Sequence, residues 1–170
     1  RVGGGMFVLE MPTGEIKRVA TGSFRQFERS GDFIYAVEYV EKALVQFDLD
    51  FKVVKKVSLD KPNYCGLALN NEDGLIYLAN AGTDEVSVFD MRSLEMVKKR
   101  PFNTNQLGAE HHVNDLCYFE GILYCSYFSY CGGFKRGVFD GGVAALEVNE
   151  EEAMPVQLIG GLWKPHTPKF

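Results

Sequence analysis

The sequence predicts an all-β protein, a β-propeller built from four-stranded antiparallel blades. Its 170 residues are 46% hydrophobic and 13% aromatic, which is enough to bury a sizeable core. No amphipathic segment is long enough to predict a helix, and glycine and proline mark many turns. Short strand patterns also recur in one fixed order. A four-stranded unit that repeats about every 40–50 residues is typical of a propeller blade.

Three kinds of short unit carry this repeat. The first places a turn residue before a strand, at residues 32–36, 74–78 and 121–125. A second strand follows each time, at residues 44–48, 86–90 and 143–147, and a strand with paired lysines recurs at 54–57 and 96–99. Tyr77 follows Tyr35 by 42 residues, and Tyr124 follows Tyr77 by 47. The spacing therefore matches one blade per repeat.

The repeats divide the chain into a partial blade, three complete blades and the start of another: residues 4–20, 24–59, 64–100, 111–160 and 165–170. In each blade we expect strands a to d to run outward from a central axis. These pieces do not close a ring, so we expect a segment of a longer propeller, six-bladed given the short repeat. A closed four-bladed ring would lack one strand. An ordinary two-sheet sandwich would not explain units that recur in one order.

Composition excludes several classes of partner. The net charge of −5 argues against nucleic acid, because binding phosphates requires clustered lysine and arginine. No apolar run approaches the roughly 20 residues of a membrane span. The chain starts at Arg1, so we expect a truncated N-terminus that carries no information about a signal peptide. The pattern does not determine the oligomeric state.

The four cysteines predict reduced thiols and therefore a cytoplasmic protein. They show neither a CxxC pair nor the spacing of a zinc site. Cys117 and Cys125 lie within apolar strand patterns, where cysteine behaves as a small hydrophobic residue. A Cys125–Cys131 disulfide is the alternative.

The starts of the a strands carry the candidate binding residues. In a propeller these starts surround one mouth of the central channel, beside the d-to-a and b-to-c loops. Here they supply Arg25, Tyr64, His111, His112, Asn114, Asp115 and His166. A half-buried polar cluster of this kind needs a ligand, water or a cation to satisfy it. We therefore expect a ligand-binding site, with His112 and His166 as the candidate catalytic residues.

The b-to-c connection of the third complete blade supports the same mouth. Residues 129–142 form a long, glycine-rich loop, whereas the second blade uses only about residues 81–84. Long loops with aromatic and basic side chains are more often functional than structural. Lys135 and Arg136 provide a cationic pair that could meet a carboxylate, phosphate or uronic acid group.

Each of these features also has an ordinary structural explanation. His112 could hydrogen-bond the backbone of neighbouring blades, and Asn114 and Asp115 could cap the d-to-a turn. His166 could hold a rigid turn between two prolines. Tyr35, Tyr77 and Tyr124 fit packing between blades better than a stacking platform. These explanations leave the shared location of His112, Asn114, Asp115 and His166 unexplained.

Two short motifs resemble known propellers. Residues 112–115, followed by 121–124, resemble the six-bladed gluconolactonase, paraoxonase and regucalcin group. Together with Pro-His-Thr-Pro at 165–168, they are also similar to a group of uncharacterised bacterial propeller proteins, and this resemblance covers most of the chain. The lactonase resemblance implies a divalent cation, often calcium, held by Asn114 and Asp115. The acid that it implies at another strand start is replaced by Asn63-Tyr64.

The sequence therefore predicts a propeller that binds a small molecule or a carbohydrate at the channel mouth. One alternative is a divalent-cation-dependent hydrolase of lactones or esters, in which His112 or His166 acts as general base. The other is a non-catalytic scaffold that binds a protein over the same face.

Overall fold

The computed structural model describes residues 4–102, 110–150 and 153–169. Its regular elements in this part of the chain are fourteen β-strands and one turn of 3-10 helix, η1, at Phe134–Arg136. The predicted all-β class is therefore confirmed. None of the helices among the described residues is long and apolar enough to cross a membrane.

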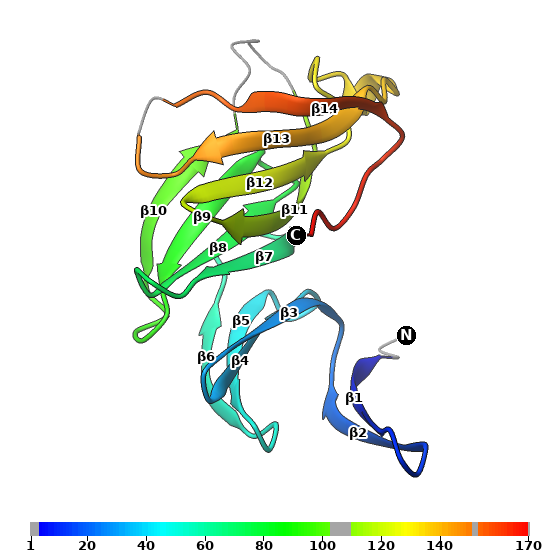
Figure 1. Cartoon of the computed structure of the whole chain (residues 1–170), viewed down its shortest axis with the longest axis vertical. Helices are drawn as coiled ribbons and strands as arrows, with labels where there is room; N and C mark the ends of the chain where they lie inside the picture. Colours follow the sequence, from blue (N-terminus) through cyan, green and yellow to red (C-terminus); the bar gives the residue numbers. More distant parts are fainter. Residues whose placement is uncertain (1–3, 103–109, 151–152, 170) are drawn as a thin grey trace.

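The strands form one two-stranded sheet and three four-stranded antiparallel sheets (Figure 1). The small sheet pairs β1 (Gly5–Glu10) with β2 (Glu15–Thr21). The first full blade contains β3 (Phe24–Ser30), β4 (Phe33–Glu38), β5 (Ala43–Asp48) and β6 (Val53–Ser58). The second contains β7 (Tyr64–Asn70), β8 (Leu75–Asn80), β9 (Glu85–Asp90) and β10 (Met96–Pro101). The third contains β11 (Val113–Phe119), β12 (Ile122–Tyr127), β13 (Gly141–Glu147) and β14 (Val156–Leu162).

Each blade is a meander in which every strand pairs with the next one along the chain. The turn between strands a and b contains a glycine in the left-handed region in each full blade: Gly31, Gly74 and Gly121 have φ values of 55°, 68° and 83°. Glycine adopts this conformation without steric cost, so the turn can be tight. Gly74 and Gly121 directly precede strand b, whereas in the first blade Asp32 stands between Gly31 and strand b.

The a strands β3, β7 and β11 face one another, as the predicted central axis requires. β7 contacts both β3 and β11. The amide of Leu67 on β7 donates a 2.8 Å hydrogen bond to Oε1 of Gln26 on β3. On the other side, a Cβ added at Gly66 would lie only 2.7 Å from the Cα of Asp115. The strands approach this closely because residue 66 has no side chain.

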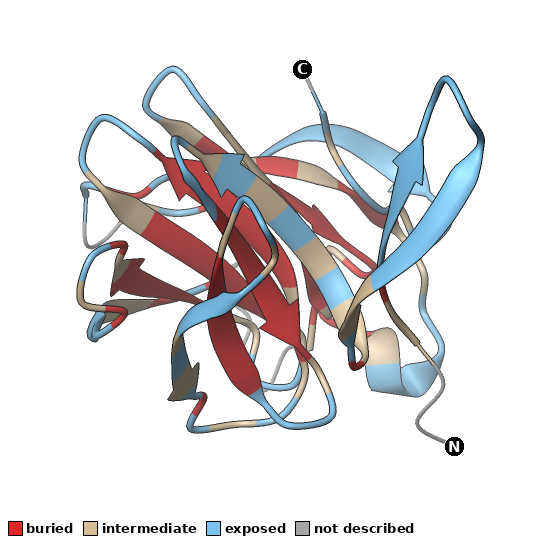
Figure 2. Cartoon of the chain, turned by 90° about the horizontal axis from the view of Figure 1, so that it is seen from below, coloured by how far each residue is buried: buried red, intermediate tan, exposed pale blue. Residues whose placement is uncertain are grey.

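The core lies between the blades, where the b and c strands are buried and the outer strands are exposed (Figure 2). Tyr35 and Tyr77 are buried, and Tyr77 stacks on Tyr118 of the next blade with ring centroids 5.6 Å apart. The equivalent Tyr124 is only partly buried. The expected packing role is confirmed for the first two tyrosines. All four cysteines are free thiols, so the Cys125–Cys131 disulfide does not form.

The start of a further a strand, expected at residues 165–170, is not formed by residues 165–169, and Phe170 lies outside the described residues. Residues 165–169 run as irregular chain beside β11 (Figure 1). Their bonds go to side chains: Thr167 binds Asp115, and Lys169 binds Glu28 on β3. Side-chain partners at irregular intervals do not impose the regular ladder of a strand.

Candidate functional site

A pocket of about 250 Å³ lies where the a strands begin. Its walls come from the starts of β3, β7 and β11, from the b-to-c connections of all three full blades, and from the C-terminal segment. The lining residues are Arg25, Tyr39, Asn63, Cys65, Ala81, His112, Asn114, Phe128 and His166. Four of the predicted site residues therefore meet at one pocket: Arg25, His112, Asn114 and His166.

His112 occupies the turn that leads into β11. Its backbone is left-handed, with φ of 55°, which is uncommon for a residue with a side chain. The imidazole stacks on Phe128 and on Phe134, with centroid distances of 4.6 Å and 4.1 Å. Burial among these rings lowers the pKa of His112, and the charges of His166 and Lys164 lower it further, against the opposing effect of Asp84. The imidazole is therefore neutral at neutral pH.

Asp84 fixes the strained turn from the second blade. One carboxylate oxygen accepts a 2.5 Å hydrogen bond from the amide of His111, and the other accepts a 3.1 Å bond from the amide of Val113. Burial raises the pKa of Asp84, and these amide bonds act in the opposite direction. A carboxylate of blade two thus orients the histidine turn of blade three.

The C-terminal segment closes the opposite wall. Nδ2 of Asn114 contacts Nδ1 of His166, and the His166 ring meets Phe128 edge-on at 5.2 Å. Oδ2 of Asp115 accepts bonds from the amide and hydroxyl of Thr167, at 3.1 Å and 2.8 Å. Asp115 therefore anchors the segment, and Asn114 positions the imidazole of His166 at the pocket.

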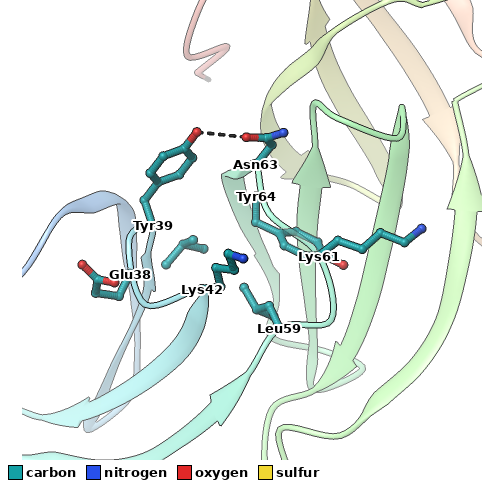
Figure 3. Close-up of a pocket in the computed structure, with 8 residues that line it drawn as sticks. Glu38, Tyr39, Lys42, Leu59, Lys61, Asn63 and Tyr64 are labelled. Atoms are coloured by element: carbon teal, nitrogen blue, oxygen red, sulfur yellow. Dashed lines mark hydrogen bonds between the residues drawn. The ribbon is translucent and has the colours of Figure 1, made fainter.

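Blade one contributes a cation over an aromatic ring. The Arg25 guanidinium lies 4.3 Å from the centroid of the Tyr39 ring. The Tyr39 hydroxyl donates a 3.0 Å hydrogen bond to Oδ1 of Asn63, across the boundary between blades one and two (Figure 3). Asn63 has φ of 70°, a conformation that asparagine tolerates better than most residues. The three side chains form one linked wall.

Asp140 organises the long loop of the third blade. Its carboxylate accepts hydrogen bonds from the Ser129 hydroxyl and the amides of Tyr130 and Cys131. Burial alone would raise the pKa of Asp140, but the bonds from Ser129 and Cys131 hold it below its usual range. The loop is thereby folded so that Phe134 covers His112. The sequence analysis placed residues 129–142 at this mouth, and Phe134 is the residue of that loop that stacks on His112.

Five predicted site residues do not line this pocket. His111 is buried, with Nδ1 2.9 Å from the carbonyl oxygen of Ser129. The Tyr64 hydroxyl is buried 2.9 Å from the hydroxyl of Ser87. Lys135 forms an ion pair with Glu110, Arg136 is exposed on η1, and Asp115 binds Thr167. Burial or an internal partner removes most of them from ligand contact.

Sequence reasoning missed Tyr39, Phe128 and Asp84 as parts of the site. Tyr39 and Phe128 both follow strand b, and this position alone could have indicated them. Asp84 carried no local signal, because its role depends on hydrogen bonds to the amides beside His112.

A second pocket of about 230 Å³ adjoins the first. The two share Asn63, Ala81 and His112. The remaining lining residues of the second are Gly82, Asp84, Glu110, Phe134 and Lys135. His112 therefore faces both, and the predicted cation Lys135 belongs to the second.

The residues do not fit the divalent cation that the lactonase resemblance implies. No group of three or more metal-binding His, Cys, Asp or Glu side chains occurs within the described residues. Calcium requires about six to eight oxygen ligands. Both oxygens of Asp115 already accept bonds, from the Leu116 amide and from Thr167, and Nδ2 of Asn114 is engaged with His166. We therefore derive no chemistry through a metal.

Cys65 is the thiol that lines the first pocket. Burial raises its pKa to about 11, despite opposing backbone hydrogen bonds. The thiolate is the nucleophilic form of cysteine, and it is scarcely populated here at neutral pH. Cys65 is thus a packing residue of the pocket wall.

Solved structures of β-propeller proteins resemble this chain. They include the glutaminyl cyclase of Myxococcus xanthus, at 12% identity and a TM-score of 0.60 over 84% of this chain and 56% of that one. Hydrazine synthase of Kuenenia stuttgartiensis has 15% sequence identity and a TM-score of 0.56, and the match covers 74% of this chain and 32% of that one. The β-propeller domain of Cps50 (Swd1) from Myceliophteria thermophila has 14% sequence identity and a TM-score of 0.53, and the match covers 78% of this chain and 38% of that one.

The likeness establishes the fold, since all these identities are below 25%. The chain spans between about a third and just over half of the length of these proteins. No family model and no curated protein matches the sequence. The chain has the architecture of a β-propeller.

Proposed function

We propose that the chain binds a small polar ring compound, such as a monosaccharide, in the pocket at the a-strand starts. The observation that carries this proposal is the combination of aromatic and polar groups around one pocket. Phe128 and Tyr39 offer apolar ring surface, whereas Asn63, Asn114 and His166 offer amide and imidazole groups. Sugars present both kinds of surface, since their C–H faces pack on rings and their hydroxyls form hydrogen bonds.

The dimensions agree with a ligand of this size. Pockets for drug-sized molecules measure roughly 300–1,000 Å³. At about 250 Å³, this pocket suits a single sugar ring. Its walls are also held in place by internal contacts, including the Tyr39–Asn63 hydrogen bond and the His112 ring stack. A pre-formed site loses little conformational entropy when the ligand binds.

Asn114→Ala provides the test. We expect at least about tenfold weaker binding, because the variant loses an amide in the pocket and the contact that positions His166. A panel of neutral hexoses and hexuronic acids would be titrated by calorimetry, and the bound surface mapped by NMR. Asn71→Ala, at an exposed position in the a-to-b turn of blade two, is the matched control.

Two results would contradict the proposal. One is a panel in which no sugar perturbs the pocket residues, which would favour the scaffold alternative. The other is unchanged affinity in the Asn114→Ala variant, provided that circular dichroism shows both variants to be folded.

Hydrolysis of a lactone or ester is a second candidate function. It is favoured by His112, whose imidazole is neutral and lines both pockets. A neutral imidazole can take a proton from water as the water oxygen adds to the carbonyl carbon. The imidazolium then returns the proton to the leaving oxygen as the C–O bond of the lactone or ester breaks. This mechanism would require no metal ion.

A further inference from the structure

The pocket has an unusual charge for this protein. The chain carries a net charge of −5, yet the lining includes a guanidinium and no carboxylate. The two nearest acids along the strands are used internally. Asp115 binds Thr167 and the Leu116 amide, and Asp84 binds the amides of His111 and Val113. The pocket is therefore the place where an acidic protein offers a cation to a ligand.

Arg25 is that cation. Within the described residues it makes no ion pair, whereas Lys56, Lys61, Lys99, Lys135 and Lys169 all do. Its guanidinium is placed by stacking on Tyr39, which Asn63 holds by a hydrogen bond. Stacking on a ring leaves the N–H groups along the edge of the guanidinium able to donate. An exposed but oriented fork of donors is suited to a planar anion.

We propose that the pocket selects ring compounds that carry a carboxylate, with the hexuronic acids as the class, and that Arg25 binds the carboxylate. This inference rests on the proposed function, because it names the ligand class of the same pocket. The sugar ring lies against Phe128 and the His112 stack, with Asn63 and Asn114 at its hydroxyls. The carboxylate lies toward blade one, where Arg25 begins the first a strand.

The charge of the site favours a carboxylate over a phosphate. A phosphate monoester carries nearly two negative charges at neutral pH, and its sites usually combine several cations or backbone amides. Among the residues that line the pocket, Arg25 carries the one permanent positive charge, because His112 is neutral and Lys135 is already paired with Glu110. A single planar guanidinium matches a single planar carboxylate in both charge and shape.

The test compares methyl β-D-glucuronide with methyl β-D-glucoside, which share one ring and differ in a carboxylate at C6. By calorimetry we expect the glucuronide to bind the wild-type chain about tenfold more tightly or better, the scale of a charge-assisted hydrogen bond. Arg25→Gln should remove this preference, measured as the ratio of the two affinities in the same variant, so that the glucuronide binds no more tightly than the glucoside. Raising the salt concentration should weaken the glucuronide more than the glucoside.

Arg29→Gln is the matched control for charge. Arg29 is exposed on the same strand, and its Nε donates to the carbonyl oxygen of Gly31, at the far end of β3. This variant should keep the full preference for the glucuronide. If Arg29→Gln reduced the preference as much as Arg25→Gln does, the effect would come from net charge and the assignment of Arg25 would be overturned.

Three further results would overturn the inference. Equal affinities for the two glycosides would refute carboxylate selection and leave the proposed function standing. Failure of both glycosides and of the whole sugar panel to bind would refute the proposed function as well. Tighter binding of glucose 6-phosphate than of the glucuronide would assign the site to phosphate instead.

Discussion

At the scale of single residues, His112 combines a strained backbone with a partly buried side chain whose pKa is lowered. It has a left-handed backbone, and strain of this kind is maintained only where the surroundings enforce it. The Asp84 bonds on both sides of the turn and the stack between Phe128 and Phe134 supply that enforcement. The imidazole is consequently buried enough to resist protonation.

The lowered pKa of His112 predicts a loss of stability in mild acid. The unfolded chain takes up a proton near the ordinary value of 6.5, whereas the folded chain resists it until a lower pH. The unfolded state therefore binds more protons in this window, and the free energy of unfolding falls as the pH drops from about 6.5 to the folded pKa. His112→Phe keeps a stacked ring but has no group that titrates there. Its free energy of unfolding should therefore fall less on acidification than that of the wild-type protein.

Urea denaturation at about pH 7.5 and about pH 5.5 measures this effect. The relevant quantity is the change in free energy of unfolding between the two pH values, compared between the two proteins, so that groups common to both cancel. An identical change in wild type and His112→Phe would show that another group controls the acid response.

At the scale of elements, the contact between β7 and β11 positions the site. Gly66 lies on β7 opposite the backbone of Asn114 and Asp115 on β11. This close approach sets how far Cys65, on one wall of the pocket, lies from Asn114 on another. A glycine inside a strand usually marks such a place, where another backbone comes close.

Gly66→Ala should therefore disturb stability and binding together. The new Cβ would lie 2.7 Å from the Cα of Asp115 and 2.8 Å from the carbonyl oxygen of Asn114, and these backbone atoms cannot move independently. We expect a loss of about 1–3 kcal/mol in the free energy of unfolding, as for other overpacked sites. Ligand affinity should also fall, since β11 must shift.

Gly160→Ala on β14 is the control for this variant. There the nearest atom to the new Cβ would be Nε2 of Gln157, the end of a side chain, which can move at the cost of its hydrogen bond to the Tyr127 hydroxyl but without any backbone shift. Chemical denaturation of both variants gives the comparison. Equal costs at the two positions would mean that the β7–β11 approach does not constrain the fold.

At the scale of the whole molecule, buried polar links join neighbouring blades. Arg100, at the outer edge of blade two, is only 3% exposed and donates to the carbonyl oxygens of Glu147, Glu150 and Ala153 in blade three. Lys98 donates to Val148 in the same region. Glu147 is the last residue of β13, whereas Val148, Glu150 and Ala153 belong to the connection between β13 and β14. One guanidinium therefore fixes the outer part of blade three to blade two.

Arg100→Met tests this link. Methionine retains an apolar stem but donates no hydrogen bonds, so the carbonyl oxygens of Glu147, Glu150 and Ala153 lose their donor. We expect the free energy of unfolding to fall by at least about 1.5–3 kcal/mol, the contribution of one hydrogen bond to a charged group. Hydrogen exchange should show the largest loss of protection in β13 and β14.

Arg92→Met controls for the loss of a positive charge, because Arg92 is exposed in the turn after β9. It should leave both the stability and the exchange pattern nearly unchanged. Uniform loss of protection over all three blades in Arg100→Met would contradict a local link between blades two and three.

Much of the architecture was predictable because it is local. The turn residues and the short strand patterns each depend on neighbouring residues, and their repetition at spacings of 42 and 47 residues predicted the strands of all three full blades. The geometry of a propeller then indicated that Arg25, His112, Asn114 and His166 would share a mouth, since equivalent positions of successive blades lie around one axis. The structure places these four residues at one pocket.

What the sequence alone determined is therefore the order of strands and the ends at which polar residues gather. Tertiary structure decided which of those residues face the pocket. Lys135 forms an ion pair with Glu110, and Asp115 and His111 form hydrogen bonds with Thr167 and Ser129. Arg25 instead stacks on Tyr39 at the pocket. Periodicity fixes where a residue lies along a strand, but the partner it takes depends on charges and hydrogen-bonding groups that only folding brings within reach.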